Sequence, residues 1–215
     1  MIYTVTLNPA LDKTVQIPSF RLGEVNRISA MRTDPGGKGI NVSKVLRELG
    51  EPSVAAAILG GAAGQKIESA LRALGIEGMY LFTGHETRTN LKIVDPTLHT
   101  NTDVNEPGAP ADEAVLSKLL SQLTGRLRPG DLVVLSGKAP AGAPDTLYRD
   151  WILACRAAGA AVYLDAEGEL LRQGVTAGPA LIKPNQAELS GVMGRPLTTE
   201  DETIRAAQEL LKSME

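Results

Sequence analysis

The stretch that decides the fold is Asp34-Pro35-Gly36-Gly37-Lys38-Gly39-Ile40-Asn41-Val42. Its glycines predict a tight turn, and apolar residues at helical spacing predict a helix directly after it: Ile40, Val42, Val45, Leu46 and Leu49. Such a turn aims free backbone N–H groups and the positive end of the helix dipole at one point, which suits an anion. Lys38 adds a mobile positive charge there. The alternative is an ordinary strand-to-helix turn that happens to contain a lysine.

Two common phosphate-binding loops are missing from the sequence. No Gly-x-x-x-x-Gly-Lys-Ser/Thr tract occurs, and Gly60-Gly61-Ala62-Ala63-Gly64 lacks the Gly-x-Gly-x-x-Gly spacing. The sequence therefore predicts neither a P-loop nor a dinucleotide-binding Rossmann unit.

The composition is that of an ordinary globular protein. The chain has 215 residues, of which 43% are apolar and 22% charged, with a net charge of −3. We expect no nucleic-acid or membrane partner, since there is no basic excess and no apolar run of about 20 residues. The N-terminus begins as a strand without a signal-peptide pattern, and the single cysteine, Cys155, lies in an apolar helical pattern. Cys155 is interpreted as a core residue, and the expected setting is the reducing cytoplasm.

Short β-rich runs alternate with amphipathic helical patterns along the chain. The predicted strands are 2–7, 54–59, 79–83, 132–136, 161–165 and 180–182, and the predicted helices are 40–49, 65–74, 112–127, 145–157, 185–193 and 200–213. This alternation predicts a doubly wound α/β fold: one mostly parallel sheet with helices on both faces.

Two segments, approximately 13–34 and 89–105, interrupt the alternation. Residues 14–17 with 25–32, and 90–95 with the stretch to 104, look like extended ribbon without a helix between them. They predict a small β-flap that covers a site as a lid. An edge hairpin with only a packing role is the alternative.

Two polar groups are candidate ligand contacts. Asp12 follows the first strand at the end where open α/β sheets bind ligands, and could accept hydrogen bonds from sugar hydroxyls. Arg88, Asn90 and Lys92 alternate, so in a strand they share one face and would suit a phosphorylated polyol. The alternatives are an exposed turn for Asp12 and a solvated strand face for the other three.

The tract Lys183-Pro184-Asn185-Gln186-Ala187-Glu188 also has two interpretations. Asn185 as helix N-cap with Glu188 three residues later is a variant of the capping box and needs no ligand. The functional interpretation places Asn185 and Glu188 near the phosphates and Mg²⁺ of a nucleotide, with Glu188 acting on the metal through water.

Five motifs together resemble the ribokinase-like, PfkB-type carbohydrate kinases. They are Asn8-Pro9-Ala10-Leu11-Asp12, Pro35-Gly36-Gly37-Lys38-Gly39-Ile40-Asn41-Val42, Thr87-Arg88-Thr89-Asn90, Leu135-Ser136-Gly137 and Lys183-Pro184-Asn185-Gln186-Ala187-Glu188-Leu189. They occur in the family's order and look most like the branch with 1-phosphofructokinase and tagatose-6-phosphate kinase.

The resemblance implies an ATP-dependent kinase that phosphorylates a hydroxyl of a hexose phosphate, most similar to the fructose 1-phosphate enzymes. It implies that the sugar is held by Asp12, Gly37, Asn41 and Asn90. Its phosphate would meet Arg27, Lys38 and Arg88, together with Lys92. It also implies that Mg·ATP lies beside Lys183, Asn185 and Glu188. The lid of this family corresponds to the predicted flap, and it implies a homodimer formed through the lid.

The sequence departs from the family pattern at three places. Lys138 stands where the family usually has the second serine of Ser-Gly-Ser, which typically touches the substrate phosphate; Lys138 either replaces that contact as a cation or obstructs it. The tract Asp165-Ala166-Glu167-Gly168-Glu169 lacks the usual hydroxyls. The family's Gly-Ala-Gly-Asp tract, which carries the catalytic aspartate, would lie beyond Glu215, so no catalytic residue is predicted within the chain. The chain thus resembles the first two thirds of a family member, and we expect it to be inactive alone. The alternative is a non-catalytic sugar-phosphate-binding protein.

Overall fold

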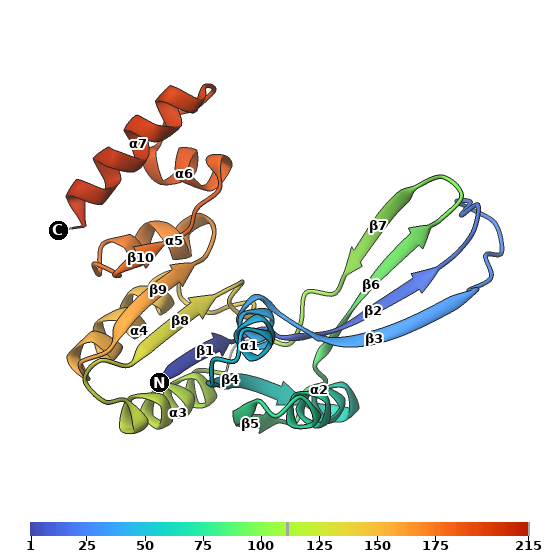
Figure 1. The fold of residues 1–215 in the computed structure, drawn as a ribbon, viewed down its shortest axis with the longest axis horizontal. Helices are drawn as coiled ribbons and strands as arrows, with labels where there is room; N and C mark the ends of the chain where they lie inside the picture. The colour runs from blue at the N-terminus through green and yellow to red at the C-terminus, as the bar shows by residue number, and fades with distance from the viewer. Residues whose placement is uncertain (111, 215) are drawn as a thin grey trace.

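The main body of the protein is a six-stranded parallel sheet with the strand order β10-β9-β8-β1-β4-β5 (Figure 1). The computed structural model describes residues 1–110 and 112–214. The strands are β1 (Ile2–Thr6), β4 (Ser53–Gly60), β5 (Glu77–Thr83), β8 (Leu132–Ser136), β9 (Ala161–Asp165) and β10 (Leu181–Ile182). All six coincide closely with predicted strands, and the parallel arrangement confirms the predicted fold class.

Helices cover both faces of this sheet, as doubly wound folds require. The helices are α1 (Lys38–Glu48), α2 (Gly61–Ala73), α3 (Glu113–Arg126), α4 (Leu147–Ala157), α5 (Gly168–Val175), α6 (Gln186–Met193) and α7 (Glu200–Ser213). Alternate residues of β4 show the two faces. Ala55 and Ala57 pack in one core with α1 and α2, whereas Val54 and Ala56 belong to a larger core with α3 and α4. The described chain ends with α6 and α7, which extend from α5.

A second sheet of four strands, here called the lid, projects from the main body (Figure 1). Its strands are β2 (Ala10–Gln16), β3 (Ala30–Gly36), β6 (Arg88–Asp95) and β7 (Thr100–Asn105), in the order β3-β2-β6-β7. The chain leaves the main sheet after β1, returns through β3 into α1, and leaves again after β5. The lid is thus built from two separate excursions, around the two segments that interrupt the predicted alternation.

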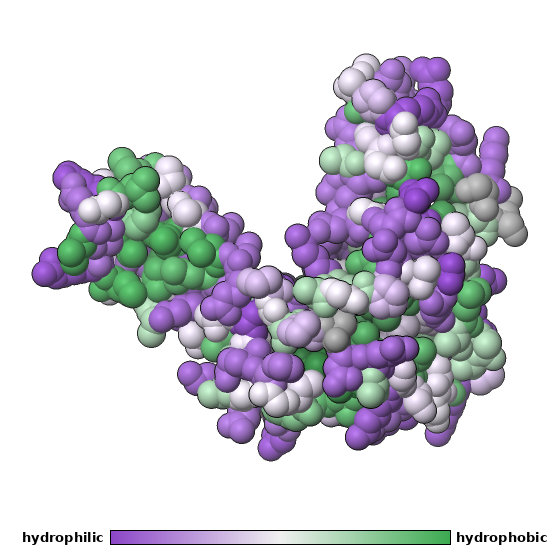
Figure 2. All heavy atoms as spheres, turned by 180° about the vertical axis from the view of Figure 1, so that it is seen from behind, coloured by the Kyte–Doolittle hydropathy of each residue, from purple (hydrophilic) through white to green (hydrophobic). Residues whose placement is uncertain are grey.

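The two faces of the lid differ in chemistry. Because side chains alternate along a strand, the register places Asp12, Thr14, Asn90 and Lys92 together on one polar face. The opposite face carries apolar residues that pair across the strands: Met31 with Val15, Val15 with Ile93, and Leu91 with Val104. Viewed from behind, the lid presents a broad apolar surface (Figure 2), to which exposed Met31 and Val104 contribute.

Three details of the fold differ from the sequence prediction or complete it. The strand expected from residue 25 begins only at Ala30, because Asn26 folds the preceding residues into a turn by bonding to the backbone of Arg21 and Glu24. Helix α5 was not predicted, since it is short and contains two glycines. Cys155 is fully buried, and burial raises the pKa of its thiol to about 12, which confirms its interpretation as a core residue.

The described residues contain no helix that is both long and apolar enough to cross a membrane.

Candidate functional site

The candidate site lies where the winding of the main sheet changes direction. From β1 the chain proceeds to β4 and β5 on one side, whereas β8 is followed by β9 and β10 on the other. The carboxyl ends of the neighbouring strands β1 and β8 therefore flank a switch point, where open α/β sheets bind ligands. A cleft of about 300 Å³ opens there. It is lined by Thr6, Asn8, Gly37, Lys38, Asn41, Arg88, Asn90, Asn105, Ser136, Gly137 and Lys138.

Helix α1 begins at this cleft in an unusually close approach to β1. Gly37 is the N-cap residue of α1, with a φ of 117°, a conformation that favours glycine, and it has no side chain with which to cap the helix. A Cβ at Gly39 would lie 2.5 Å from both Thr6 Oγ1 and Val5 O. The hydroxyl of Thr6 accepts a hydrogen bond from the Ile40 N–H at 2.9 Å. The glycines thus let the positive helix end sit at the strand terminus, as the predicted anion site requires.

The polar face of the lid supplies the opposite wall. Asn90 donates a hydrogen bond from Nδ2 to Asp12 Oδ1 at 3.0 Å, so the two predicted sugar contacts are joined. Asn90 lines the switch-point cleft and also an adjoining cleft of about 550 Å³, in which Asp12 and Lys92 lie. The buried Oδ1 of Asn90 and Oγ of Ser136 find no hydrogen-bond partner among the described residues. Buried polar atoms normally have partners, so these two are candidates for ligand or water contacts.

Arg88 stands at the hinge between lid and main body. Its guanidinium donates to the carbonyls of Asn8 at 3.1 Å, Pro9 at 3.4 Å and Glu106 at 2.9 Å. Burial lowers the pKa of Arg88, although the nearby carboxylates of Asp12 and Glu106 act in the opposite direction. Three of the five N–H groups of its fork are committed to the backbone, so Arg88 positions the hinge and has only two donors left for a ligand.

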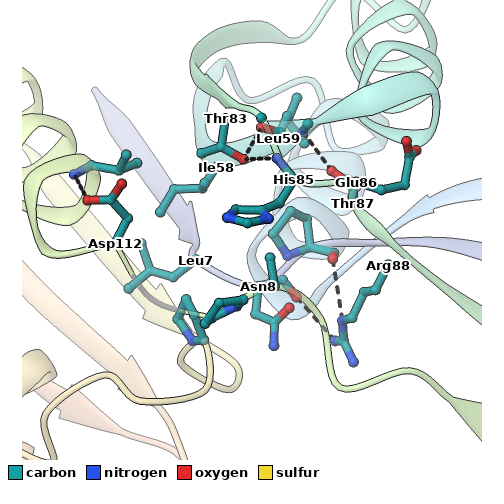
Figure 3. A pocket seen from close by; sticks show the side chains of 17 residues that line it. Leu7, Asn8, Ile58, Leu59, Thr83, His85, Glu86, Thr87, Arg88 and Asp112 are labelled. Atoms are coloured by element: carbon teal, nitrogen blue, oxygen red, sulfur yellow. Dashed lines mark hydrogen bonds between the residues drawn. The ribbon is translucent and has the colours of Figure 1, made fainter.

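A smaller cavity of about 180 Å³ lies beside this hinge and shares Asn8 and Arg88 with the cleft (Figure 3). Glu86 stands at its rim and accepts hydrogen bonds from the backbone N–H groups of Ala62 and Ala63 at the start of α2. The carboxylate therefore caps α2, and this helix end is already satisfied.

Three lysines and two carboxylates meet beyond β8 and β9. Asp165 Oδ1 is shared by Lys38 Nζ at 3.1 Å and Lys183 Nζ at 3.4 Å. Lys138 Nζ lies 3.0 Å from Glu167 Oε1. The group carries one net positive charge, and each lysine is exposed enough to exchange its carboxylate for another anion.

Two hydrogen bonds hold the loop that carries Lys138, and both are made by the backbone of Gly137. Gly137 has a φ of 94°, its N–H donates to Asp165 O at 2.9 Å, and its carbonyl accepts from Tyr148 Oη at 3.0 Å. Burial, the largest effect, and the nearby Asp165 both raise the pKa of Tyr148, so its hydroxyl keeps the proton that it donates. Lys138 is therefore presented from a fixed loop.

Comparison with known proteins identifies the family. The family model for the pfkB family carbohydrate kinases matches residues 5–215. The chain belongs to this family. A 1-phosphofructokinase of Xanthomonas campestris is 38% identical over 97% of the chain and 67% of that protein. A tagatose-6-phosphate kinase of Staphylococcus epidermidis is 33% identical over 96% of the chain and 67% of that protein.

Solved structures agree. Phosphofructokinase-2 from Escherichia coli in complex with fructose-6-phosphate superimposes with a TM-score of 0.94, at 32% identity, over 99% of this chain and 70% of that one. A ribokinase of Arabidopsis thaliana, with a TM-score of 0.71 and 20% identity, shares the fold. The ribokinase-like fold is thus confirmed, and the chain spans about two thirds of the length of these relatives.

The structure brings together some of the predicted site residues. Gly37, Lys38, Asn41, Arg88, Asn90 and Lys138 line the switch-point cleft, and Asp12 and Lys92 line the adjoining one. Lys92 lies 3.8 Å from Asp103 across the lid. Arg27 lies apart, exposed in the loop between β2 and β3, and lines neither cleft. Its predicted phosphate contact stays a prediction.

Of the predicted nucleotide residues, Lys183 belongs to the lysine group, and Asn185 and Glu188 lie at the start of α6. Asn185 and Glu188 form the capping box of α6: Asn185 Oδ1 accepts from the Glu188 N–H at 2.9 Å, and Glu188 Oε2 accepts from the Asn185 N–H at 2.8 Å. Lys183 reaches the cleft side only through Asp165. The described part of the chain holds no cluster of three or more His, Cys, Asp or Glu residues that could bind a metal ion.

The catalytic aspartate is predicted to lie past the last residue of the sequence. The resemblance places that aspartate beyond Glu215, and Glu215 itself lies outside the described residues. The structure therefore does not test this prediction.

Sequence reasoning missed Asn8, Asn105, Asp165 and Glu167 as residues of the site or its surroundings. Asp165 stands in a tract that departs from the family pattern. Its position at the end of a predicted strand, on the ligand-binding edge, is the signal that could have identified it.

Proposed function

We propose that this chain forms the sugar-phosphate side of an ATP-dependent hexose-phosphate kinase, with fructose 1-phosphate as the first candidate substrate. The observation that carries the proposal is the cleft at the switch point, which Lys38 and Lys138 line together with Asn41 and Asn90. Cations suit a phosphate, and amides suit hydroxyls. Relatives named 1-phosphofructokinase support the choice of substrate. Tagatose 6-phosphate is the alternative substrate, and a non-catalytic sugar-phosphate-binding protein is the alternative function.

Each wall of the cleft has a separate task in this proposal. Asp12, Gly37, Asn41 and Asn90 hold the sugar. Lys38, Lys138 and the remaining donors of Arg88 hold its phosphate, with Lys92 further out on the lid. Arg27, exposed at the lid tip, is the least supported contact.

The nucleotide belongs beyond Asp165. Lys183 is exposed and can turn from Asp165 to a phosphate, and Glu188 retains one carboxylate oxygen outside the capping box for a water of Mg²⁺. These residues fit Mg·ATP by charge, and the bound ion would neutralise phosphate charge. The Gly-Ala-Gly-Asp tract expected from the resemblance does not occur in the sequence. We therefore expect residues 1–215 to bind the sugar phosphate without transferring a phosphoryl group.

The lid is also proposed to join two copies of the chain. Its apolar face includes the exposed side chains of Met31 and Val104. Val15 and Ile93 on the same face are buried and pack together. One structural relative is a tetrameric inhibited form of phosphofructokinase-2 from Escherichia coli, which makes self-association a reasonable proposal.

Calorimetry and a coupled ADP-release assay test the proposed function. Fructose 1-phosphate should bind better than tagatose 6-phosphate, and both better than fructose, because fructose lacks the phosphate. Lys38→Met should weaken binding of fructose 1-phosphate by about tenfold or more through loss of a charge-assisted contact. Lys118→Met, on the exposed side of α3, is the matched control and should bind as wild type.

Two outcomes count against the proposal. Failure of the wild type to bind either sugar phosphate would refute the assigned site. ADP release at the ~1–100 s⁻¹ usual for kinases would refute the expectation that these 215 residues bind the sugar phosphate without transferring a phosphoryl group to it.

A further inference from the structure

Lys138 and Glu167 occupy equivalent places on adjacent strands. Ser136 at the end of β8 pairs with Asp165 at the end of β9, and each of the two charged residues lies two positions further along its chain. Their side chains meet with Nζ and Oε1 3.0 Å apart. These are also two positions at which the sequence departs from the family pattern, and the structure brings them into contact.

Glu167 has no evident role in its own helix. It is the N-cap residue of α5, yet its side chain makes no capping hydrogen bond to any described residue. Three other helices of the chain are capped by their N-cap side chains, Asp112, Asn185 and Thr199. Small polar residues fill this position best, and their side chains accept from the first-turn N–H groups. The carboxylate of Glu167 instead extends toward Lys138.

The two partners differ in their relation to the cleft. Lys138 lines the switch-point cleft, whereas Glu167 lies outside its lining. Their side chains are 67% and 47% exposed, so water screens the pair and its net stabilisation is small. A weak, exposed ion pair of this kind exchanges readily for a stronger anion.

We propose that Glu167 competes with the substrate phosphate for Lys138 and thereby lowers the affinity of the cleft for sugar phosphates. With the cleft empty, Glu167 holds the Lys138 ammonium. A sugar phosphate, which carries more negative charge than a carboxylate, takes the ammonium over, and Glu167 is released to solvent. Glu167 therefore weakens the binding of any ligand whose anion must take Lys138 from it, and it leaves the binding of neutral sugars unaffected. The inference rests on the proposed sugar-phosphate site.

A competing explanation is that Glu167 serves only the dipole of α5. A negative charge near a helix N-terminus is favourable even without a capping hydrogen bond. This explanation predicts that loss of the charge lowers helix stability and leaves ligand affinity unchanged, so the two can be separated by measurement.

Calorimetric titration with fructose 1-phosphate tests the proposal. The variants are Glu167→Gln, Lys138→Met and the double variant, with thermal unfolding as a check on folding. Glu167→Gln should strengthen binding by about threefold, since the competing charge is removed. Lys138→Met should weaken it by about five- to tenfold. In the Lys138→Met background, Glu167→Gln should have no further effect.

Glu169→Gln is the matched control on the same helix. It removes the same charge from a carboxylate that is bound to Arg172 and Gln173, and it should leave the affinity as in wild type. The proposal is overturned if Glu167→Gln leaves affinity unchanged or weakens it. It is also overturned if the gain persists without Lys138 or appears equally in Glu169→Gln. If the wild type binds no sugar phosphate, the proposed sugar-phosphate site itself is refuted. If the wild type binds and only the Glu167 variants behave otherwise than expected, the proposal for Glu167 alone is refuted.

Discussion

Asp95 is the residue that organises the tip of the lid. It is only 2% exposed, and its carboxylate accepts hydrogen bonds from the backbone N–H groups of Ser19, Phe20, Thr97 and Leu98. Burial by itself raises the pKa of Asp95, but these four donors outweigh burial and the net pKa lies below its ordinary value. The carboxylate therefore stabilises the folded tip at every pH above the unfolded pKa of about 4, and this contribution is lost as the pH falls below it.

We predict that Asp95→Asn removes most of the amide protection at the tip. Measured by NMR at pH 7 and corrected for intrinsic exchange, the amides of residues 19, 20, 97 and 98 should exchange faster than in wild type. Wild type should show the same loss on acidification below about pH 4. Asp103→Asn, which removes an exposed carboxylate of the lid paired only with Lys92, is the control. Unchanged protection in Asp95→Asn would contradict the assigned role.

Individual residues show how far sequence reasoning reaches. The capping box of Asn185 and Glu188 was predicted because its partners are three residues apart and its geometry is local. The ion pair between Lys38 and Asp165 joins residues 127 positions apart, and no local pattern encodes it. Likewise, the sequence suggested that Arg88 holds a phosphate, but it did not reveal that the guanidinium is largely committed to the backbone of the hinge.

The contact between helix α1 and strand β1 depends on Gly39. At this position a methyl group would meet Thr6 Oγ1 and Val5 O at 2.5 Å, well inside van der Waals contact. We predict that Gly39→Ala destabilises the protein by about 1–3 kcal/mol through overpacking. It should also weaken sugar-phosphate binding, because α1 must move away from the cleft.

Gly125→Ala provides the matched control for Gly39→Ala. Gly125 also lies in a helix, α3, but nothing stands within 4 Å of the place its Cβ would take. There the substitution should be neutral or stabilise by about 0.5–1 kcal/mol, because alanine lowers the entropy of the unfolded chain. Chemical denaturation measures both. Equal effects of the two substitutions would show that the approach of α1 to β1 is not restrictive.

The elements themselves were largely predictable. Strands β4 and β8 are short, continuous apolar runs between turn residues, the pattern of strands buried on both faces of a parallel sheet. Helix α5 escaped prediction because eight residues with Gly168 and Gly174 give a weak pattern, and tertiary packing of Leu171 and Val175 stabilises it instead. The order of the strands was not predicted, because it depends on pairings between strands far apart in the sequence, such as β1 with β8.

At the scale of the whole molecule, the lid has one polar and one apolar face. This difference between the faces predicts how two copies of the chain associate. The polar face of the lid contributes to the lining of the two clefts, whereas the opposite face leaves Met31 and Val104 58% and 55% exposed. A sheet face with exposed apolar side chains of this kind is a candidate interface between two copies, because burying it against an identical face removes apolar surface from water. We therefore expect the protein to be a dimer at micromolar concentration.

Val104→Lys tests this assembly, because it places a charge on the apolar face of β7. Sedimentation velocity should show a shift from dimer to monomer, since an unpaired charge in the interface is unfavourable. Asn101→Lys, on the same strand but on the opposite, polar face, should remain dimeric. A wild type that stays monomeric as its concentration rises would exclude the lid dimer. If Val104→Lys sedimented like the wild-type dimer, the copies would have to meet elsewhere, and the apolar face of the lid would need another partner.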